Sequence, residues 1–273
     1  MRYDSTTGLT SGQVTELVAR IFQVLSGRPS LPGRPALLNL REQVILTLLL
    51  LRQNLNQAAV ADLHGVSQAT VSRIYRRIVP LIEQACCFSG ISLEEAVRGR
   101  VVLVDGTDVP TGNRAKTGRS TYSGKRHRQG LNVQIAADLD GGLLAASDPV
   151  AGARHDRVAL ALCGWEPILD DTDWIADPGY IGTTATTPRK RPHGTTLDDN
   201  TKKSNREISR TRSAVERCIA HFKNWKIIAT GYRLPATGYR LSATADASAN
   251  SPPSSAPSQN SNSTDSAGKQ PYE

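Results

Sequence analysis

The sequence has 273 residues, with 33 Lys and Arg against 25 Asp and Glu, a formal net charge of +8 and a pI near 9.5. This length suits one large domain or a medium domain plus a small one, and the basic balance favours nucleic acid over an anionic membrane surface as partner. The most apolar stretch, Val44 to Leu51, is far shorter than the roughly 20 residues that span a bilayer, and Met1 to Gly12 lacks an apolar signal core. The four cysteines have no C-x-x-C spacing, so we expect reduced thiols in a cytoplasmic protein.

The N-terminal residues are predicted to form an amphipathic helix followed by a linker. Apolar residues recur at helical spacing from Val14 to Leu25, and Gly27 is the expected end of the helix. Residues 28–35 are rich in proline, which is typical of a linker or arm. A second helix is expected from about Asn39 to Gln53, apolar enough to form the core of a helical domain.

A helix-turn-helix is predicted next. A short helix over residues 57–63 leads into the turn His64-Gly65-Val66, where Gly65 supplies a conformation that other residues resist, and a second helix follows over 67–78. Pro80 is expected to end or kink this second helix. An ordinary hairpin of two helices with a polar face is the alternative. The outward polar side chains suit contacts with base edges or phosphates, and we assign DNA binding to Ser67, Gln68, Thr70 and Arg73.

A short buried strand that ends in a carboxylate is predicted at Val101-Val102-Leu103-Val104-Asp105. Four consecutive apolar, mostly β-branched residues suit a strand that is covered on both faces. Gly106 breaks the run, so Asp105 lies where the strand ends and a site can open. An isolated Asp-Gly pair also commonly begins a turn, so the functional interpretation depends on the other carboxylates of the chain.

A basic segment and a hairpin follow this strand. Residues 114–128 contain six Lys or Arg, one His and no acid, which fits either a solvated surface or a track for a phosphate backbone. Residues 131–136 and 143–146, joined by the turn Asp140-Gly141-Gly142, are expected to form a β-hairpin that pairs antiparallel with the Asp105 strand. Asp156 opens a helix, where we expect it to stabilise the helix N-terminus rather than perform chemistry.

A second strand ending in an acid is predicted at Trp174-Ile175-Ala176-Asp177, and residues 183–187 fit a further short strand. A polar helix is then expected to begin near Lys203. On it, Arg212, Glu216 and Lys223 are separated by four and seven residues, which places them on one face. Taken alone, Arg212 and Glu216 also fit an ordinary surface ion pair.

Three acids therefore share a context: Asp105 and Asp177 at strand exits, and Glu216 on a downstream helix, with basic segments between them. Converging carboxylates repel one another unless cations lie among them. Oxygen ligands without a His or Cys set favour Mg²⁺ or Mn²⁺ over zinc. Two such ions can stabilise both the attacking and the leaving oxygen of an in-line phosphoryl displacement, so we expect two ions.

Residues from about 36 to 233 resemble bacterial insertion-sequence transposases of the DDE class, in the group that includes the IS-five type. The matching segments are Gly65 to Ile74, Val104-Asp105-Gly106-Thr107, Gly152-Ala153-Arg154-His155-Asp156, Ala176-Asp177-Pro178-Gly179-Tyr180 and Arg212-x-x-x-Glu216-x-x-x-x-x-x-Lys223, the R-E-K part of the transposase signature.

The resemblance implies an α/β fold (an α+β mixed sheet) with an RNase H-like catalytic core, preceded by an all-α helix-turn-helix domain. It implies that Asp105, Asp177 and Glu216 are catalytic metal ligands, and that Arg212 and Lys223 contact DNA phosphates near the cut. The corresponding domains are residues 1–35 (helix and linker), 36–98 (helix-turn-helix), 99–233 (catalytic domain) and 234–273 (disordered tail).

Three features depart from the family pattern. Ser209 stands where a tyrosine often precedes the signature Arg, and Pro178 replaces the lysine usual after the second acid. Family-like sequence stops near Arg233, where Ala-Thr-Gly-Tyr-Arg-Leu of residues 229–234 is repeated at 236–241. Residues 242–273 contain no Leu, Ile, Val, Phe or Met, so we expect a disordered tail and a truncated or frameshifted C-terminus.

The leading hypothesis from the sequence is a nucleoid-associated transposase that cleaves and transfers DNA strands at the ends of an insertion sequence. Its expected partners are double-stranded DNA, both the terminal inverted repeats and the target, and further copies of itself on that DNA, but no membrane. The alternative is a catalytically decayed copy that acts only as a helix-turn-helix DNA-binding protein. A stand-alone structure-selective nuclease fits the acids but leaves the DNA-reading domain unexplained.

Overall fold

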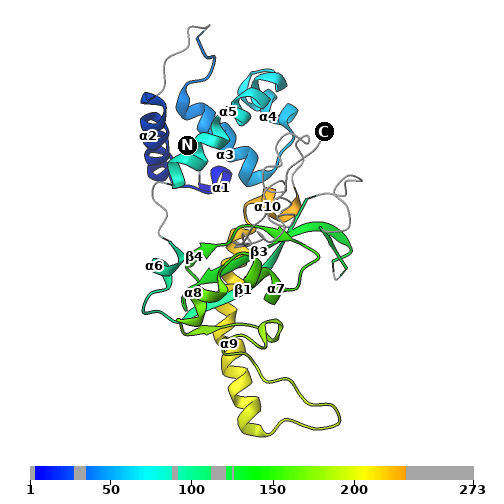
Figure 1. The fold of residues 1–273 in the computed structure, drawn as a ribbon. Coiled ribbons are helices and arrows are strands. Elements are labelled where there is room, and N and C mark those ends of the chain that lie inside the picture. Colours follow the sequence, from blue (N-terminus) through cyan, green and yellow to red (C-terminus); the bar gives the residue numbers. More distant parts are fainter. Residues whose placement is uncertain (1–3, 28–34, 88–91, 112–120, 125, 232–273) are drawn as a thin grey trace, which may run out of the picture.

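The computed structural model describes residues 4–27, 35–87, 92–111, 121–124 and 126–231. The predicted tail (234–273) and four members of the basic segment, Arg114, Lys116, Arg119 and Lys125, lie outside these residues. The described chain divides into a helical region and a sheet region, which Figure 1 shows one above the other. Within the described residues, no helix has both the length and the apolar character to cross a membrane.

Five helices make up the helical region: α1 (Asp4–Thr7), α2 (Ser11–Ser26), α3 (Leu40–Gln53), α4 (Gln57–His64) and α5 (Gln68–Cys87). Helices α2 and α3 begin as the sequence predicts, because Thr10 and Asn39 each form a capping box with the residue three positions on. Their apolar faces share one core with α4 and α5, built around Val14, Ile21, Val44, Leu46, Val60, Val71 and Ile78. Helix α2 therefore packs as part of the helical region although a linker follows it.

Helices α4 and α5 confirm the predicted helix-turn-helix. Gly65 ends α4 in the left-handed conformation, with φ of 62°, which favours glycine. Val71 and Ile74 of α5 are buried against the other helices, whereas Gln68 and Arg73 are exposed. The expectation that Pro80 ends the second helix is wrong, since α5 continues without a break to Cys87.

The sheet is mixed. Strands β1 (Val102–Pro110) and β3 (Arg128–Ala137) pair antiparallel over eight residue pairs, and β6 (Trp174–Ile175) pairs parallel with β1. Strands β2 (Tyr122–Ser123), β4 (Leu143–Ala146) and β5 (Val150–Ala151) all pair antiparallel with β3. The predicted hairpin of β3 and β4 is thus confirmed, but residues 183–187 contribute only an isolated bridge from Thr186 to Ile175.

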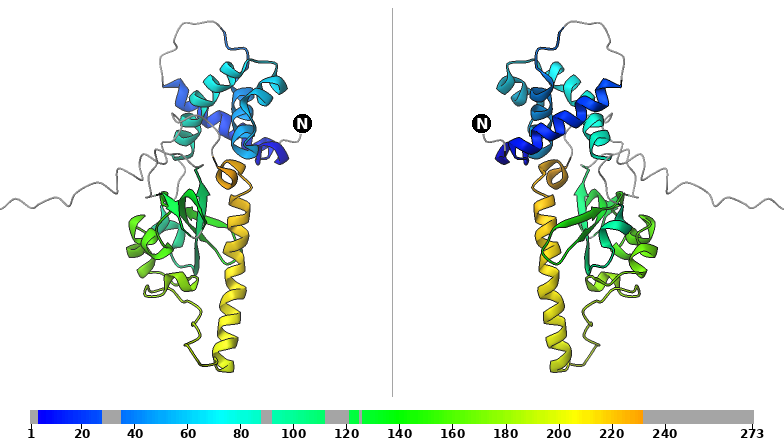
Figure 2. Two further views of the ribbon diagram at one scale, coloured as in Figure 1. Left: turned by 90° about the vertical axis from the view of Figure 1, so that its right-hand side faces the viewer. Right: turned by 90° about the vertical axis from the view of Figure 1, so that its left-hand side faces the viewer.

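Helices cover both faces of this sheet (Figure 2). Helices α6 (Leu93–Val97), α7 (Asp156–Leu162) and α8 (Glu166–Asp170) contribute to a core with Val102 and Val104 on one face. Helix α9 (Asp199–Phe222) packs Ala214, Val215 and Cys218 on the other face, against Leu103. Successive β1 residues therefore serve opposite cores, as expected for a strand with two covered faces.

Helix α9 begins four residues earlier than the sequence predicts. The carboxylate of Asp198 accepts hydrogen bonds from the backbone N–H of Thr201 at 2.7 Å and from its hydroxyl at 2.8 Å. Such a side-chain cap satisfies N–H groups that the helix itself leaves unpaired. The apolar pattern begins only at Ile208, and for that reason it gave no sign of the exposed first turns.

A short helix joins the two regions. Helix α10 (Lys226–Thr230) contacts both α3 and β1 (Figure 1). Asn54, which ends α3 in the left-handed conformation, donates from Nδ2 to Thr230 Oγ1 at 2.8 Å and to the Gly231 carbonyl at 2.7 Å. Trp225 packs against the helical core, and the Arg52 guanidinium lies 5.4 Å from the centre of its ring. The end of α9 is therefore fixed to the DNA-reading region.

Replacing Asn54 tests this junction. Asn54→Gly keeps a residue that accepts the left-handed backbone but removes both hydrogen bonds, and it should lower the free energy of unfolding by about 1–3 kcal/mol. Asn54→Ala should cost roughly 1 kcal/mol more, because alanine resists the positive φ. Denaturant unfolding of the two variants measures this order. Equal stability of wild type and Asn54→Gly would show that the hydrogen bonds contribute nothing.

Candidate active site

Asp105 lies in the middle of β1, on the face that α9 covers. It follows Leu103 at the strand period of two, and its side chain is about one-fifth exposed. The backbone N–H of Gly106 donates to its Oδ1 at 2.9 Å. The predicted strand is longer than expected, since β1 continues through Gly106 to Pro110, so Asp105 is an interior position of the strand rather than its last residue.

Arg212 of α9 forms an ion pair with Asp105, at 3.2 Å between Nη2 and Oδ2. Both side chains are largely buried, with 14% of Arg212 and 20% of Asp105 exposed. Arg212 Nε and Thr107 Oγ1 are buried and have no hydrogen-bond partner among the described residues. Buried donors without partners are rare in folded proteins, so the surroundings of this ion pair can accept further oxygen ligands or water.

The environment raises the pKa of Asp105 to about 6. Burial is the largest cause, because it disfavours the charged form, and the neighbouring Asp177 and Asp156 carboxylates also raise the pKa. The Arg212 guanidinium and the Gly106 N–H lower it, but by less than the rise. A carboxyl with this pKa is poorly balanced by the protein alone, which fits a position that an additional cation would stabilise.

Asp177 lies beside Asp105, two residues beyond β6. Leu103 pairs with Ile175 in parallel register, so the next residues on the same face of the two chains are Asp105 and Asp177. The Asp177 carboxylate caps the 3₁₀ turn η1 (Pro178–Tyr180) by accepting from the Gly179 N–H at 2.8 Å. The proline at 178 begins this turn, where a missing N–H has no cost.

Asp156 is a third acid near this pair, and its surroundings could not be predicted from the sequence. It is the first residue of α7, as expected, but its Oδ1 accepts from Asn132 Nδ2 at 2.8 Å. Its carboxylate also fills the space beside Gly106 and Gly179, one neighbour of each strand-end acid. The small residues after Asp105 and Asp177 therefore make room for Asp156.

A chain of buried polar side chains supports Asp156. The Tyr180 hydroxyl donates to Gln134 Oε1, and Gln134 Nε2 donates to Asn132 Oδ1 at 2.9 Å. Tyr180 and Gln134 are fully buried. Burial and then the Asp156 charge raise the pKa of Tyr180 well above its ordinary value, so the phenol stays a donor. The alternating pattern of β3 could have indicated Gln134, because a polar residue stands at a core position of the strand.

Glu216 and Lys223 lie on the same side of α9 as Arg212, at spacings of four and seven residues. Glu216 is exposed, and it is not among the charges that shift the pKa of Asp105. Lys223 is half-buried, and burial followed by Arg126 lowers the pKa of its ammonium group. In the described part of the chain, no three His, Cys, Asp or Glu side chains are arranged to hold a metal ion. The structure thus brings together Asp105, Asp177 and Arg212, but not Glu216.

The four DNA-binding candidates all lie around the start of α5. Ser67 Oγ accepts from the Thr70 N–H at 3.2 Å and lies 3.0 Å from Thr70 Oγ1, so Ser67 also caps the helix. Arg73 reaches back to Thr70 Oγ1 at 3.4 Å. Gln68 is exposed and has no side-chain hydrogen bond among the described residues. These side chains form one polar surface at the helix start, which is the part that a recognition helix presents to DNA.

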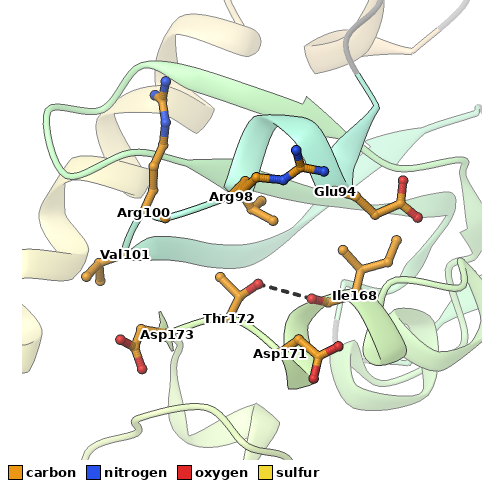
Figure 3. A pocket seen from close by; sticks show the side chains of 10 residues that line it. Glu94, Arg98, Arg100, Val101, Ile168, Asp171, Thr172 and Asp173 are labelled. Carbon is orange, nitrogen blue, oxygen red and sulfur yellow. Dashed lines mark hydrogen bonds between the residues drawn. The ribbon is translucent and has the colours of Figure 1, made fainter.

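A pocket of about 510 Å³ lies at the other end of β1 (Figure 3). Glu94, Arg98, Arg100, Asp171 and Asp173 are among the residues that line it, and Thr172 donates to the Ile168 carbonyl at 3.1 Å. Basic and acidic side chains alternate around this pocket, and none of the candidate site residues lies in it. It is therefore separate from the carboxylates.

Comparisons with known proteins agree with this architecture. The family described as DDE superfamily endonuclease matches residues 104–245, and the helix-turn-helix of DDE superfamily endonuclease matches residues 36–88. The first match continues past Arg233, where the sequence analysis placed the end of the resemblance. A Streptomyces albus G protein named as a transposase for insertion sequence element IS112 is 32% identical over 198 residues, which cover 72% of this chain and 73% of that protein. No solved structure matches the chain.

The raised pKa of Asp105 predicts how stability changes with pH. The folded chain holds this proton up to about pH 6, whereas the unfolded chain releases it near 3.8, so stability should fall as the pH rises between these values. The difference corresponds to roughly 2–3 kcal/mol. In buffer with a chelator, Asp105→Asn should therefore be more stable than wild type at pH 8 by about this amount, and the gap should close near pH 4. Denaturant unfolding at both pH values measures it, and a gap that does not depend on pH would contradict the assignment.

The packing of Asp156 against Gly106 can be tested by adding one methyl group. In Gly106→Ala the new Cβ would overlap the Asp156 carboxylate and lie 3.1 Å from Gln134 Nε2. We expect a loss of about 1–3 kcal/mol in the free energy of unfolding. Gly12→Ala is the control, since nothing lies within 4 Å of a Cβ at that position of α2. The double variant Gly106→Ala/Asp156→Ala should recover part of the loss, and no recovery would mean that other atoms cause the clash.

Proposed function

The chain belongs to the DDE superfamily endonucleases, and from that premise we propose that it is a transposase that cleaves and transfers DNA strands at the ends of an insertion sequence. One observation supports this most strongly. Asp105 and Asp177 lie next to each other at two parallel-paired segments, with Arg212 of the R-E-K helix directly on Asp105. The proposal includes an RNase H-like core, which fits a mixed sheet covered on both faces by helices.

Endonucleases of this superfamily generally depend on divalent metal ions. The donor set here fits such an ion: oxygen ligands only, a buried carboxyl with a raised pKa, and unpaired polar atoms beside it. We propose that Asp105, Asp177 and Glu216 hold Mg²⁺ or Mn²⁺, two ions in all. When bound, these ions would lower the pKa of the attacking hydroxyl or water and offset negative charge on the phosphate.

Arg212 has two roles in this proposal. In the structure it neutralises Asp105, and among the described residues it is the basic side chain that forms an ion pair with that carboxylate. When cations take over that neutralisation, the guanidinium becomes free to contact a phosphate oxygen, for which its planar array of donors is suited. Lys223 lies further along the same side of α9, near Arg126 and Arg128, and adds positive charge for the same strand.

Glu216 must change its side-chain orientation to join the two aspartates. It is exposed on the side of α9 that also carries Arg212, one turn nearer the end of the helix. An exposed glutamate can rotate at little cost, since no described residue forms an ion pair with it. In this proposal the entry of cations draws Glu216 inward as Arg212 leaves Asp105.

The helical region supplies DNA recognition in the proposed function. The polar surface of Ser67, Gln68, Thr70 and Arg73 would meet the terminal inverted repeats of the element, and the chain would act as a homo-oligomer on that DNA. Gln68 suits a base edge because its amide both donates and accepts, whereas Arg73 suits base or phosphate. Target DNA would be the second substrate, for strand transfer by the freed 3′-hydroxyl.

A decayed copy that binds DNA without cutting it is the second candidate. One observation favours it: among the described residues, no three potential ligands form a ready metal site, and Glu216 is not near Asp105. This candidate keeps the helix-turn-helix and assigns no chemistry to the carboxylates.

Nicking assays separate the two candidates. Purified chain should nick element-end DNA in the presence of Mg²⁺, and Glu216→Gln, Asp105→Asn and Asp177→Asn should each lower the rate at least a hundredfold. Glu207→Gln, on the same helix, is the control and should leave the rate unchanged. DNA binding without Mg²⁺-dependent nicking in the wild type would favour the decayed copy.

DNA binding by the helix-turn-helix is tested separately. Arg73→Gln should weaken binding to every sequence, with a shallower dependence on salt if Arg73 contacts phosphate, whereas Gln68→Ala and Thr70→Ala should change sequence preference. A mismatched or lost base contact typically costs about 1–3 kcal/mol. Electrophoretic retardation with element-end and unrelated duplexes measures both effects. Unchanged binding in all three variants would remove this surface from the proposal.

A further inference from the structure

Helix α9 continues beyond the sheet that it packs on. Its buried residues, Ala214, Val215 and Cys218, all lie in its second half, and Figures 1 and 2 show the first half standing clear of the sheet. An isolated helix of this length is only marginally stable in water without an apolar face to bury. The projecting half therefore gains little from the protein core.

The projecting half is strongly basic. Residues 200–217 contain six Lys or Arg and two Glu. Four of the basic side chains recur at spacings of three, four and seven residues, which places them on one side of the helix. We refer to these exposed residues, Lys203, Arg206, Arg210 and Arg217, as the basic stripe.

The basic stripe is not neutralised within the described part of the protein. No ion pair there joins Lys203, Arg206 or Arg210 to an acid, including Glu207 on the same helix, and Arg217 donates only to Ser213 Oγ at 3.1 Å. The nearest acidic loop holds Asp138, whose Oδ1 accepts from the backbone of its own hairpin at Asp140 and Gly142. Like charges three and four residues apart destabilise a helix, so the stripe costs stability unless an anion covers it.

The stripe faces away from the candidate active site. Arg210 and Arg212 are two residues apart, which corresponds to about 200° around the helix axis. Arg212 points to Asp105, so the stripe points toward solvent on the other side. A duplex held on the stripe is therefore not the duplex whose phosphate lies at Asp105.

We propose that the basic stripe binds the phosphate backbone of a second DNA duplex. The stripe is about 21 Å long, from 14 residues at about 1.5 Å each. A duplex carries one charge per about 1.7 Å of its axis, so each of the four cations has phosphates within reach. Arginine and lysine in a row without aromatic side chains between them suit a duplex rather than single strands, which stack on aromatic rings. The proposal rests on the proposed action on DNA, and it adds a surface for a second DNA segment.

The test compares two double variants of the full chain that remove equal charge. Arg206→Gln/Arg210→Gln alters the stripe, and Arg98→Gln/Arg100→Gln alters exposed arginines at the pocket near the start of β1. Binding of a duplex of unrelated sequence is measured over a fourfold range of salt concentration. Each lost phosphate contact lowers the slope of log K against log salt by about 0.9, so the stripe variant should lose about tenfold less affinity than wild type across that range. The arginine control should match wild type.

The number of duplexes bound per chain gives a second measurement. By analytical ultracentrifugation with excess duplex, wild type should bind two per chain and Arg206→Gln/Arg210→Gln one. Arg206→Lys/Arg210→Lys keeps the charge and should restore the second, which shows that the Gln variant lost charge rather than fold. One duplex per chain in wild type, or equal slopes for the stripe variant and the arginine control, would overturn the proposal. Failure of the nicking assay alone would count against the transposase function and leave the stripe in place.

Discussion

The ion pair of Asp105 and Arg212 is the interaction on which the arrangement of the site depends. A carboxylate inside a sheet strand is unstable when covered by a helix, unless the helix brings a cation to it. Helix α9 meets this condition, because the same turns that place Ala214 and Val215 on the sheet place Arg212 on Asp105. The apolar contact fixes the rotation of the helix, and the ion pair tolerates the buried charge. The price is a carboxyl whose pKa remains raised.

The site has a second layer on the opposite face of the sheet. Asp156, Asn132, Gln134 and Tyr180 form a hydrogen-bonded chain that ends beside Gly106, directly behind Asp105. A fully satisfied polar chain in a low-dielectric interior is rigid, since each broken bond leaves an unpaired buried group. The strand that carries Asp105 is therefore held from both sides, by an ion pair in front and by a polar network behind.

Much of this fold could be predicted from the sequence, and the failures have physical causes. The helix starts at Thr10 and Asn39, the turn at Gly65 and the β3–β4 hairpin all follow from local signals, and the structure confirms them. The continuation of α5 through Pro80 depends on the packing of its later residues in the helical core, which a local rule cannot see. The early start of α9 depends on a side-chain cap in a polar segment without an apolar pattern.

The candidate site could be predicted only in part for a similar reason. Strand exits indicate Asp105 and Asp177, and helical spacing indicates Arg212 and Glu216, because these are periodic signals. The environment of Asp156 arises from contacts between α7, β3 and η1, which no spacing along the chain encodes. Whether a carboxylate faces a cation, a glycine or solvent is decided by tertiary packing, and the sequence alone left Asp156 as a helix-end residue.

The contact of α10 with α3 sets a distance as well as a stability. Asn54 ends a helix of the DNA-reading region, Gly231 lies against the Pro110 end of β1, and the two are joined by direct hydrogen bonds. Reading and cutting surfaces that are fixed to each other in this way cannot vary their separation freely. In the proposed function, the offset in base pairs between the recognised sequence and the cut is then a built-in length of the protein, and elements served by such a chain must space their ends to match it.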